Sequence, residues 1–496
     1  MKKETKTKSK KEKIKWELLL LAFLILGAVL ILPTPSELSI SGQRALAILA
    51  FAIVVWMTEA ISYPVSATLI IALITLLLGL GPSLDNPDAL MGTSEALNLA
   101  LSGFSNSAVA LVAGALFLAV AMQETGLDRR IALFILSKVG SSTRGVLIGA
   151  IIVGIALAFL IPSPTARVGA IIPIILGMIS AFGLEKESRF SALLMISSAQ
   201  IATIWSIGIK TATAQNMVAL GFIEKSFGIS ISWAQWFLAA APWSLFMTIV
   251  LYFVMIIVVP PEMDKIPNGQ QMVRQQLRKL GAITGKQVRL LFISLVLLVL
   301  WSTEESLHPF DSTTTVLIAV AIMLIPGIGV LSWKQVEKLI PWGTIILFAA
   351  GISLGSVLLK TEAATWLANT LFNNLGLRSM PIFFIVAILA GFTIIIHLGF
   401  ASATSLASTL IPVVIALVLG LEQQVVHNGI GIVLIIQFAV GFGFILPVNA
   451  PQNMLAYGTN TFTSKDLIKT GIPLTIIGYL FILLLSSTYW KWIDLL

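Results

Sequence analysis

The sequence predicts an all-α polytopic membrane protein of about eleven transmembrane helices, arranged as two inverted repeats with two re-entrant hairpins. Three observations lead to this fold class. Of the 496 residues, 57% are apolar and only 11% are charged, whereas a soluble domain has roughly 25% charged residues. Apolar stretches of about 20 residues, the length that spans a bilayer, follow one another along the chain. Polar motifs in the first half recur in the second half at a nearly constant offset.

The first predicted span is residues 16–33, and it follows a basic tail over residues 1–15 that contains eight lysines. This apolar stretch is too long for a signal peptide, so we expect it to be retained as the first helix, within residues 16–42. The other spans are expected at residues 43–60, 64–81, 107–124, 190–208, 236–259, 287–303, 311–329, 343–359, 428–446 and 470–489.

The distribution of Lys and Arg predicts how these spans are oriented, because cytoplasmic segments of membrane proteins are enriched in basic residues. With a cytoplasmic N-terminus, the predicted cytoplasmic segments hold 24 of the 31 basic residues. These segments are residues 1–15, 129–144, 184–190, 260–289, 330–342 and 459–470, and they include a linker over residues 260–286. We therefore expect a multi-pass protein of the plasma (cell) membrane with an extracellular C-terminus. The net charge of +8 could suggest nucleic acid as a partner, but this distribution argues against it, and the lipid bilayer is the expected partner.

The two halves of the chain repeat one another. SPTARVGAIIPI at 163–174 corresponds to SATSLASTLIPV at 402–413, and TATAQN at 211–216 corresponds to NAPQN at 449–453. Each half holds five spans, an odd number, so the second half is inserted in the inverted orientation. The expected boundaries are residues 43–259 for repeat 1 and 287–496 for repeat 2. Inverted repeats with paired broken helices are an architecture of secondary transporters, whose binding site lies between the halves.

Two long apolar regions, residues 143–183 and 380–420, are each broken by a short polar tip and predict the re-entrant hairpins. Each tip comes directly before a helix, whose first residues offer free N–H groups and about half a positive charge. We expect the two tips to bind an anion, one carboxylate at each, although Ser and Thr here also suit ordinary helix capping. The expected substrate-binding residues of the tips are Ser163, Pro164, Thr165, Ser402, Ala403 and Thr404.

Two further helices, over residues 190–226 and 428–458, are interrupted by polar residues together with Pro or Gly. Unwound backbone at membrane depth is tolerated where it lines a cavity or packs inside the protein. Asn216 and Asn453 lie at equivalent places in these interruptions. Their amides either bind the substrate or hold the broken helix together, and the sequence leaves both roles open.

Three basic or potentially basic residues are predicted inside the membrane: Arg167, Lys210 and His397. Ionisable groups at this depth are costly and indicate function. No acidic residue lies beside either hairpin tip in the sequence, so an anionic substrate is the expected partner of these charges. The alternatives are that Lys210 reaches the membrane surface and that His397 is a neutral, hydrogen-bonded core residue.

Several function classes are excluded. The chain has no GxxxxGK[ST] phosphate-binding loop, no paired carboxylates or metal-ligand spacing in its spans, no cysteine and only three histidines. These absences argue against ATP-driven transport, an enzyme, catalytic residues and a metal site. A secondary active transporter without a cofactor is the remaining prediction.

The motifs resemble those of the divalent anion/sodium symporter (DASS) superfamily over nearly the whole chain. The resemblance rests on WMTEAISYPVSA, GLDRRIALFIL, the two hairpin tips, PWGTIILFAAG and LPVNAPQN. It implies a homodimer in which a mobile transport domain moves against a scaffold domain by an elevator mechanism. It also implies that the ligand and sodium ions bind between the hairpin tips and the two interrupted helices.

The chain departs from the family pattern at both tips. The family's tips read Ser-Asn-Thr, and the asparagines, which help ligate sodium in sodium-coupled members, are here Pro164 and Ala403. SPTARVGAIIP and TATAQN are similar instead to the exchanger branch, the 2-oxoglutarate/malate and citrate or tartrate antiporters. We therefore expect a sodium-independent exchanger of dicarboxylates such as 2-oxoglutarate, malate and succinate. In it, Arg167, Lys210 and His397 would compensate substrate charge in place of sodium. A sodium-coupled di- or tricarboxylate symporter is the main alternative, and a sulfate-type anion carrier is a further one.

Overall fold

The computed structural model describes residues 15–265, 269–372, 376, 380–421 and 428–496. Within these ranges the regular secondary structure is helical, apart from isolated bridges between single residues. The prediction of an all-α membrane protein is confirmed, since eight of the described helices are long and apolar enough to cross a bilayer. The basic tail lies outside the described residues except for Lys15.

A helix lies at each of the eleven expected spans. These helices are α1 (Trp16–Ile31), α2 (Ile40–Thr58), α3 (Tyr63–Gly79), α5 (Ser107–Thr125), α9 (Arg189–Gly208), α11 (Trp233–Val258), α13 (Gly285–Ser302), α14 (Ser312–Leu324), α16 (Trp342–Lys360), α21 (Gly429–Val440) and α23 (Ser464–Ser487). Several are shorter than a full bilayer crossing, so the number of spans stays a prediction. Shorter helices between them are α4 (Thr93–Leu101), α6 (Leu127–Leu136), α12 (Gly269–Lys279), α15 (Trp333–Leu339) and α17 (Ala363–Phe372), and α24 (Tyr489–Trp492) follows α23.

Two helix pairs with short polar connections lie at the expected hairpins. The first pair is α7 (Thr143–Leu160) with α8 (Pro164–Ala181), and the second is α18 (Ile382–His397) with α19 (Ala403–Leu419). Pro164 begins α8 because its fixed φ angle suits the first helical position and its missing N–H costs nothing there.

The two interrupted helices are each continued after a single 3₁₀ turn. Helix α9 is followed by η1 (Lys210–Ala212) and α10 (Ala214–Phe227), and α21 is followed, after a longer irregular stretch, by η4 (Pro447–Asn449) and α22 (Pro451–Tyr457). The residue after each 3₁₀ turn is fully extended, with φ −157° at Thr213 and φ −148° at Ala450. The 3₁₀ turn and the extended residue after it therefore recur in both interruptions. The division of the whole chain into two inverted repeats stays a prediction.

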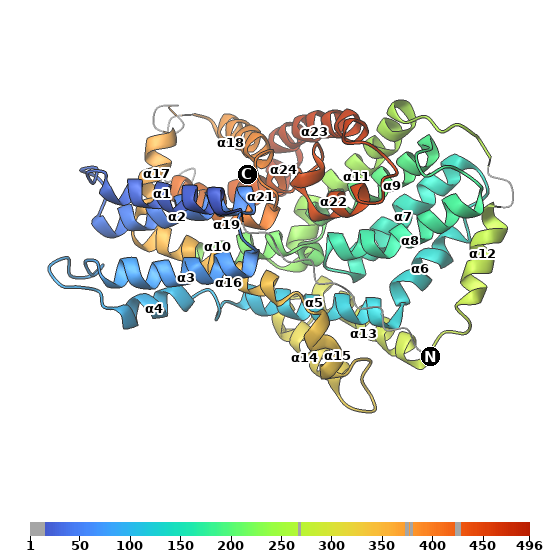
Figure 1. The fold of residues 1–496 in the computed structure, drawn as a ribbon, viewed down its shortest axis with the longest axis horizontal. Coiled ribbons are helices and arrows are strands. Elements are labelled where there is room, and N and C mark those ends of the chain that lie inside the picture. Colours follow the sequence, from blue (N-terminus) through green and yellow to red (C-terminus); the bar gives the residue numbers. More distant parts are fainter. Residues whose placement is uncertain (1–14, 266–268, 373–375, 377–379, 422–427) are drawn as a thin grey trace.

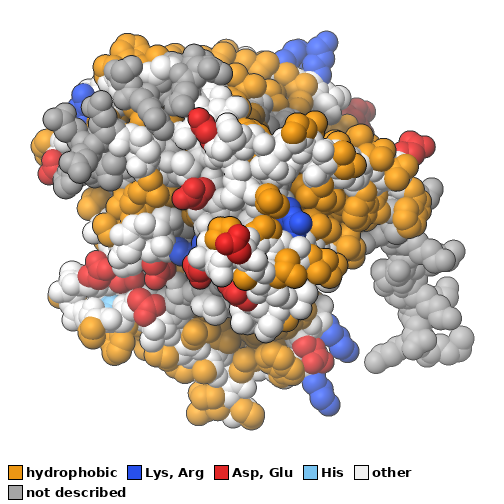
Figure 2. Space-filling model, turned by 90° about the vertical axis from the view of Figure 1, so that its left-hand side faces the viewer, with side chains coloured by type: hydrophobic (Ala, Val, Ile, Leu, Met, Phe, Trp, Pro, Cys, Tyr) orange, Lys and Arg blue, Asp and Glu red, His pale blue; other side chains and the backbone are white. Residues whose placement is uncertain are grey.

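The helices differ in how much of their surface is covered. Helix α9 is buried from Phe190 to its end, whereas α11, α13 and α23 expose large apolar side chains such as Phe253, Phe292 and Leu480. Figure 2 shows broad hydrophobic areas on the surface, with charged side chains gathered in a few places. Exposed apolar surface on this scale suits contact with lipid. Figure 1 shows α1–α4 at one end of the molecule, α6–α8 at the other, and α10, α21 and α22 between them.

Candidate functional site

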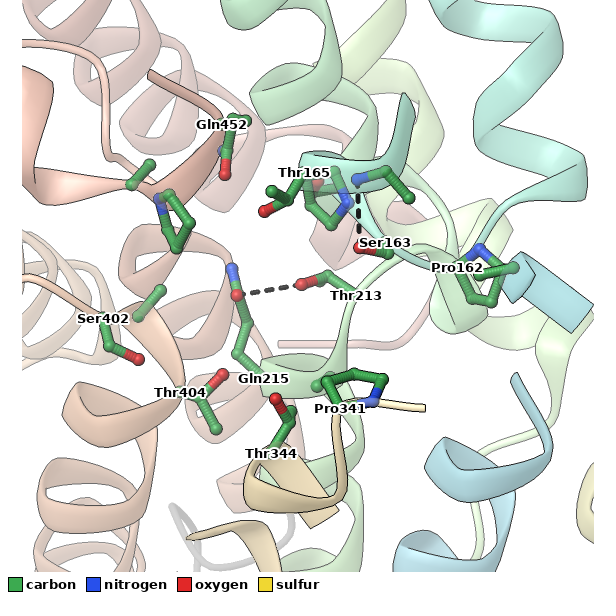
Figure 3. A pocket seen from close by; sticks show the side chains of 18 of the residues that line it. Pro162, Ser163, Thr165, Thr213, Gln215, Pro341, Thr344, Ser402, Thr404 and Gln452 are labelled. Atoms are coloured by element: carbon green, nitrogen blue, oxygen red, sulfur yellow. Dashed lines mark hydrogen bonds between the residues drawn. The ribbon is translucent and has the colours of Figure 1, made fainter. Parts of the chain in front are cut away.

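A cavity of about 530 Å³ lies where the two hairpin tips meet the two helix interruptions (Figure 3). All six tip residues selected from the sequence line it. Further lining residues come mainly from α3, α5, α9, the end of α18, the two interruptions and the start of α16. The polar ones among them are Tyr63, Gln123, Thr203, Ser206, Thr213, Gln215, Thr344, His397, Asn449 and Gln452. The folding of the chain thus brings together polar groups from both halves, as a shared binding site requires.

The two tips have nearly the same geometry. Ser163 and Ser402 are the N-cap residues of α8 and α19, with φ −146° and −141°. Each serine Oγ accepts a hydrogen bond from the backbone N–H three residues later, at 3.2 Å and 3.3 Å. Capping therefore uses an acceptor site on each serine and leaves the hydroxyl proton to donate. The Thr165 and Thr404 hydroxyls point into the cavity from opposite sides (Figure 3).

Positive potential in this cavity comes from helix ends. Four helices begin at its wall, and their first residues, Pro164, Ala214, Ala403 and Pro451, all line it. Each helix N-terminus carries about half a positive charge. Among the described residues that line the cavity, none is Asp, Glu, Lys or Arg. The site thus offers N–H groups and hydroxyls to an anion without an acidic side chain to repel it.

Asn216 and Asn453 lie behind the cavity wall. The Nδ2 of Asn216 donates to the carbonyl of Ser206 at 2.8 Å, and that of Asn453 donates to the carbonyl of Gly443 at 2.7 Å. In both cases the carbonyl belongs to a residue ten positions earlier, in α9 for Asn216 and in the irregular stretch after α21 for Asn453. These amides satisfy backbone groups that the broken helix leaves free. Their direct binding of a substrate stays a prediction.

Arg167 is fully buried and does not line the cavity. Its Nη1 donates to the carbonyls of Ile161 at 2.9 Å and Ala212 at 3.0 Å. Its Nη2 donates to the carbonyl of Ala202 at 2.9 Å and to the hydroxyl of Ser206 at 2.8 Å. The guanidinium thus joins the first hairpin tip to α9 and to η1. These four partners are neutral, so the positive charge stays uncompensated by them.

His397 lines the cavity and holds the second tip to η4. Its Nε2 lies 3.2 Å from the carbonyl oxygen of Asn449, and because a carbonyl only accepts, Nε2 carries the proton of this hydrogen bond. In return, the Nδ2 of Asn449 donates to the carbonyls of His397 at 2.9 Å and Phe400 at 3.2 Å. Both tips are therefore tied to the neighbouring interruption, by Arg167 in one half and by this pair in the other.

Lys210 does not line this cavity. It lies in a second cavity of about 440 Å³, where its Nζ is 3.6 Å from Oε2 of Glu304. Both side chains are less than a tenth exposed. From the sequence, no acidic residue lies beside the tips and Glu304 is expected on an outer segment, so Lys210 is expected to have no anionic partner within the chain. This expectation is wrong, because Glu304 is that partner. The connection between α13 and α14 folds back so that this carboxylate reaches η1. Its role in compensating substrate charge stays a prediction.

Gln215 and Gln452 are lining residues that the sequence analysis missed. Each directly precedes one of the paired asparagines, so the two glutamines are 237 residues apart, as are Asn216 and Asn453. That equal spacing is the signal that could have identified them.

Comparison with known proteins agrees with this arrangement. The family model described as the sodium:sulfate symporter transmembrane region matches residues 12–496. The chain belongs to the DASS family. It is a membrane transporter and not an enzyme, as the sequence predicts.

Three relatives match over nearly the full length. A membrane protein of Cupriavidus necator is 49% identical, covering 94% of this chain and 90% of its own length. The sodium-dependent dicarboxylate transporter SdcS of Staphylococcus saprophyticus is 27% identical, covering 96% and 92%. The citrate/succinate antiporter of Escherichia coli K12 is also 27% identical, covering 96% and 97%. The relatives with named substrates thus carry dicarboxylates or citrate.

A solved structure shows the same fold. The YdaH transporter of Alcanivorax borkumensis superimposes with a TM-score of 0.53 at 12% sequence identity, covering 86% of this chain and 97% of its own.

The expectation that this protein has no sodium requirement is corrected by these comparisons. The family description names sodium, and the S. saprophyticus relative is sodium-dependent. The expectation of sodium independence rests on the replacement of the family's two tip asparagines by Pro164 and Ala403 in this chain. Backbone carbonyls and hydroxyls also ligate sodium at broken helices, and hydroxyls remain at Thr165 and Thr404. The comparisons therefore favour sodium use.

Proposed function

We propose that this protein exchanges C4 and C5 dicarboxylates, such as 2-oxoglutarate, malate and succinate, across the cell membrane. The named relatives support this substrate class, since one is a dicarboxylate transporter and another a citrate/succinate antiporter. The shape of the site supports it too, because the two tips present equivalent donors from opposite sides of one cavity. Each tip would bind one carboxylate of the substrate.

Exchange rests on one observation, the buried charge of Arg167, whose hydrogen-bond partners are three carbonyls and a hydroxyl. Moving an uncompensated charge through the membrane costs several kcal/mol. A bound dianion compensates it, so a loaded carrier crosses more easily than an empty one. Sodium travels with the dicarboxylate in this scheme and uses the hydroxyl and backbone oxygens at the tips and interruptions.

A sodium-driven symporter is the second candidate, because the S. saprophyticus relative is a sodium-dependent dicarboxylate transporter. In that case the empty carrier returns across the membrane unaided, and a sodium gradient alone drives net uptake.

Uptake of labelled succinate into proteoliposomes distinguishes the two candidates. We expect uptake to be at least about tenfold faster with internal dicarboxylate than without it, since about 1.4 kcal/mol of extra barrier for the empty carrier gives that factor. Sodium on both sides should stimulate this exchange. Equal uptake into vesicles that contain no dicarboxylate, driven by an inward sodium gradient, would establish the symporter. Absence of any dicarboxylate uptake would reject both.

The tip threonines provide a test of where the dicarboxylate binds. Thr165→Val and Thr404→Val each remove one hydroxyl donor with little change in shape, and we expect each to weaken succinate binding about tenfold, as for a hydrogen bond to a charged group. Thr68→Val, on an exposed position of α3, is the matched control and should bind like the wild type. Unchanged affinity in both tip variants would move the binding site away from the tips.

The proposal extends to how the protein is arranged in the membrane. The clustering of basic residues on one predicted side supports a cytoplasmic N-terminus and an extracellular C-terminus in the cell membrane. Membership of the family supports a homodimer in which the hairpins and interrupted helices move against the remaining helices as an elevator. Cysteine accessibility labelling at Lys186, on the predicted cytoplasmic side, and at Asp85, on the predicted outer side, tests the orientation.

A further inference from the structure

The carboxamides of Gln215 and Gln452 enter the cavity from the two interrupted helices. Gln215 lies in the first turn of α10 and Gln452 in the first turn of α22. Both line the cavity, and in Figure 3 the amide nitrogen of Gln215 and the amide oxygen of Gln452 point toward one another across open space. At each interruption it is the following asparagine that bonds to the backbone carbonyls of the broken helix.

The orientation of the Gln452 amide follows from its neighbours. Its Nε2 donates to Oγ1 of Thr203 at 2.9 Å. The Thr203 hydroxyl donates its own proton to the carbonyl of Ala199, at 3.0 Å. It can therefore only accept from the glutamine. The Nε2 atom is thereby held against α9, and Oε1 faces the cavity. Gln452 is only 6% exposed, so its side chain is held in place and Oε1 is a fixed acceptor on the cavity wall.

Gln215 presents the opposite group. Its Oε1 accepts from the hydroxyl of Thr213 at 3.0 Å, which directs the Nε2 amide protons into the cavity (Figure 3). One glutamine therefore offers a donor and the other an acceptor, at equivalent positions of the two halves. A group that both accepts and donates a hydrogen bond satisfies the two together. An alcohol hydroxyl is such a group, whereas a ketone oxygen only accepts and a methylene does neither.

We propose that Gln215 and Gln452 form a hydroxyl-recognition pair that makes this transporter selective for 2-hydroxydicarboxylates. The proposal rests on the proposed function, because it assumes that the two carboxylates occupy the two tips. The substrate hydroxyl, on the carbon chain between them, accepts from Nε2 of Gln215 and donates to Oε1 of Gln452. A bound substrate without a hydroxyl covers the Gln452 oxygen and offers it no donor, and an acceptor left unsatisfied in this way weakens binding.

Competition against labelled succinate uptake in proteoliposomes tests this pair. Unlabelled malate is compared with succinate, and 2-hydroxyglutarate with 2-oxoglutarate, so that each comparison changes only the group at one carbon. For the wild type we expect the hydroxy compound to inhibit at about tenfold lower concentration, as for one or two well-placed hydrogen bonds. In Gln452→Met the preference for 2-hydroxyglutarate over 2-oxoglutarate should fall to about onefold, because both compounds still accept from Gln215. Part of the preference for malate over succinate should remain, and succinate uptake should continue. Gln275→Met, on an exposed position of α12, should keep the wild-type preference.

Gln215→Met separates hydroxyl recognition from carboxylate binding. Removal of the donor should weaken inhibition by malate and by 2-oxoglutarate, which both accept there, at least about fivefold more than inhibition by succinate. Equal losses for succinate and malate would show that Gln215 binds a carboxylate and would overturn the pair. A wild type that takes up succinate and shows no hydroxy preference would also overturn it, with the proposed function intact. If no dicarboxylate competes at all, the proposed function and the pair both fail.

Discussion

Arg167→Met should reduce dicarboxylate exchange by at least about tenfold, because it leaves the carbonyls of Ile161, Ala202 and Ala212 without their hydrogen-bond donor. These carbonyls belong to the first hairpin tip, α9 and η1, and the guanidinium bonds to all of them at once. Without it, Ser163 and Thr165 lose the support that fixes them at the cavity. The fixed charge that favours the loaded carrier is lost as well.

Arg167→Lys distinguishes the contribution of the hydrogen bonds of Arg167 from that of its positive charge. Lysine keeps the positive charge, but a single ammonium cannot reproduce the planar fork that reaches partners on separate elements. We expect exchange to stay at least about fivefold below the wild type, with the strict need for internal dicarboxylate retained, since the charge persists. Exchange and the melting temperature of the purified protein are measured together. Full activity in Arg167→Lys would show that charge alone matters.

Arg189→Met is the matched control for these variants. Arg189 lies at the opposite end of α9 with an exposed side chain, so its loss removes a positive charge from the same helix without touching the tip. It should exchange and melt like the wild type. A comparable loss in this variant would mean that the effect of Arg167→Met is not specific to the tip.

The sequence predicts the hairpins and interruptions well because their signatures are local. A polar tip inside an apolar region, or a proline and an asparagine inside a span, can be read from a short stretch. The same tips in both halves then place Thr165 and Thr404 together, and the cavity contains both. The irregular backbone itself is marked by residues such as Pro451 and Gly443, which regular helices avoid.

The contacts of the charged residues are not local, and here prediction from the sequence is weaker. Arg167 bonds mainly to backbone carbonyls, which every residue has, so no residue type in the sequence marks its partners. Glu304 follows Lys210 by 94 residues in a connection between helices, and only the packing of α13 and α14 brings it to η1. Sodium ligation poses the same difficulty, since the loss of an asparagine is visible whereas a compensating backbone oxygen is not.

The buried pair of Lys210 and Glu304 should give the largest loss of stability when one partner alone is removed. The Oε2 of Glu304 also accepts from the N–H of Trp233 at 3.0 Å and from the hydroxyl of Ser312 at 2.7 Å. This carboxylate therefore joins η1 to the beginnings of α11 and α14. Lys210→Met leaves a buried negative charge and Glu304→Gln a buried positive one, and each should cost about 3–5 kcal/mol.

A double-mutant cycle measures the coupling between the two residues. In Lys210→Met/Glu304→Gln both charges are gone, so we expect the loss of stability to be smaller than the sum of the single losses by at least about 1 kcal/mol. Glu305→Gln is the matched control, because Glu305 is adjacent, exposed and on the same cavity, and it should change stability by less than about 0.5 kcal/mol. Melting of the purified variants gives these values, and substrate affinity is measured in parallel. Additive losses of stability would show that Lys210 and Glu304 stabilise the fold independently of one another. If Lys210→Met instead kept its stability and lost substrate affinity, Lys210 would act on the substrate, as the sequence predicts, because an ion pair that only holds η1 in place cannot be broken without cost to the fold.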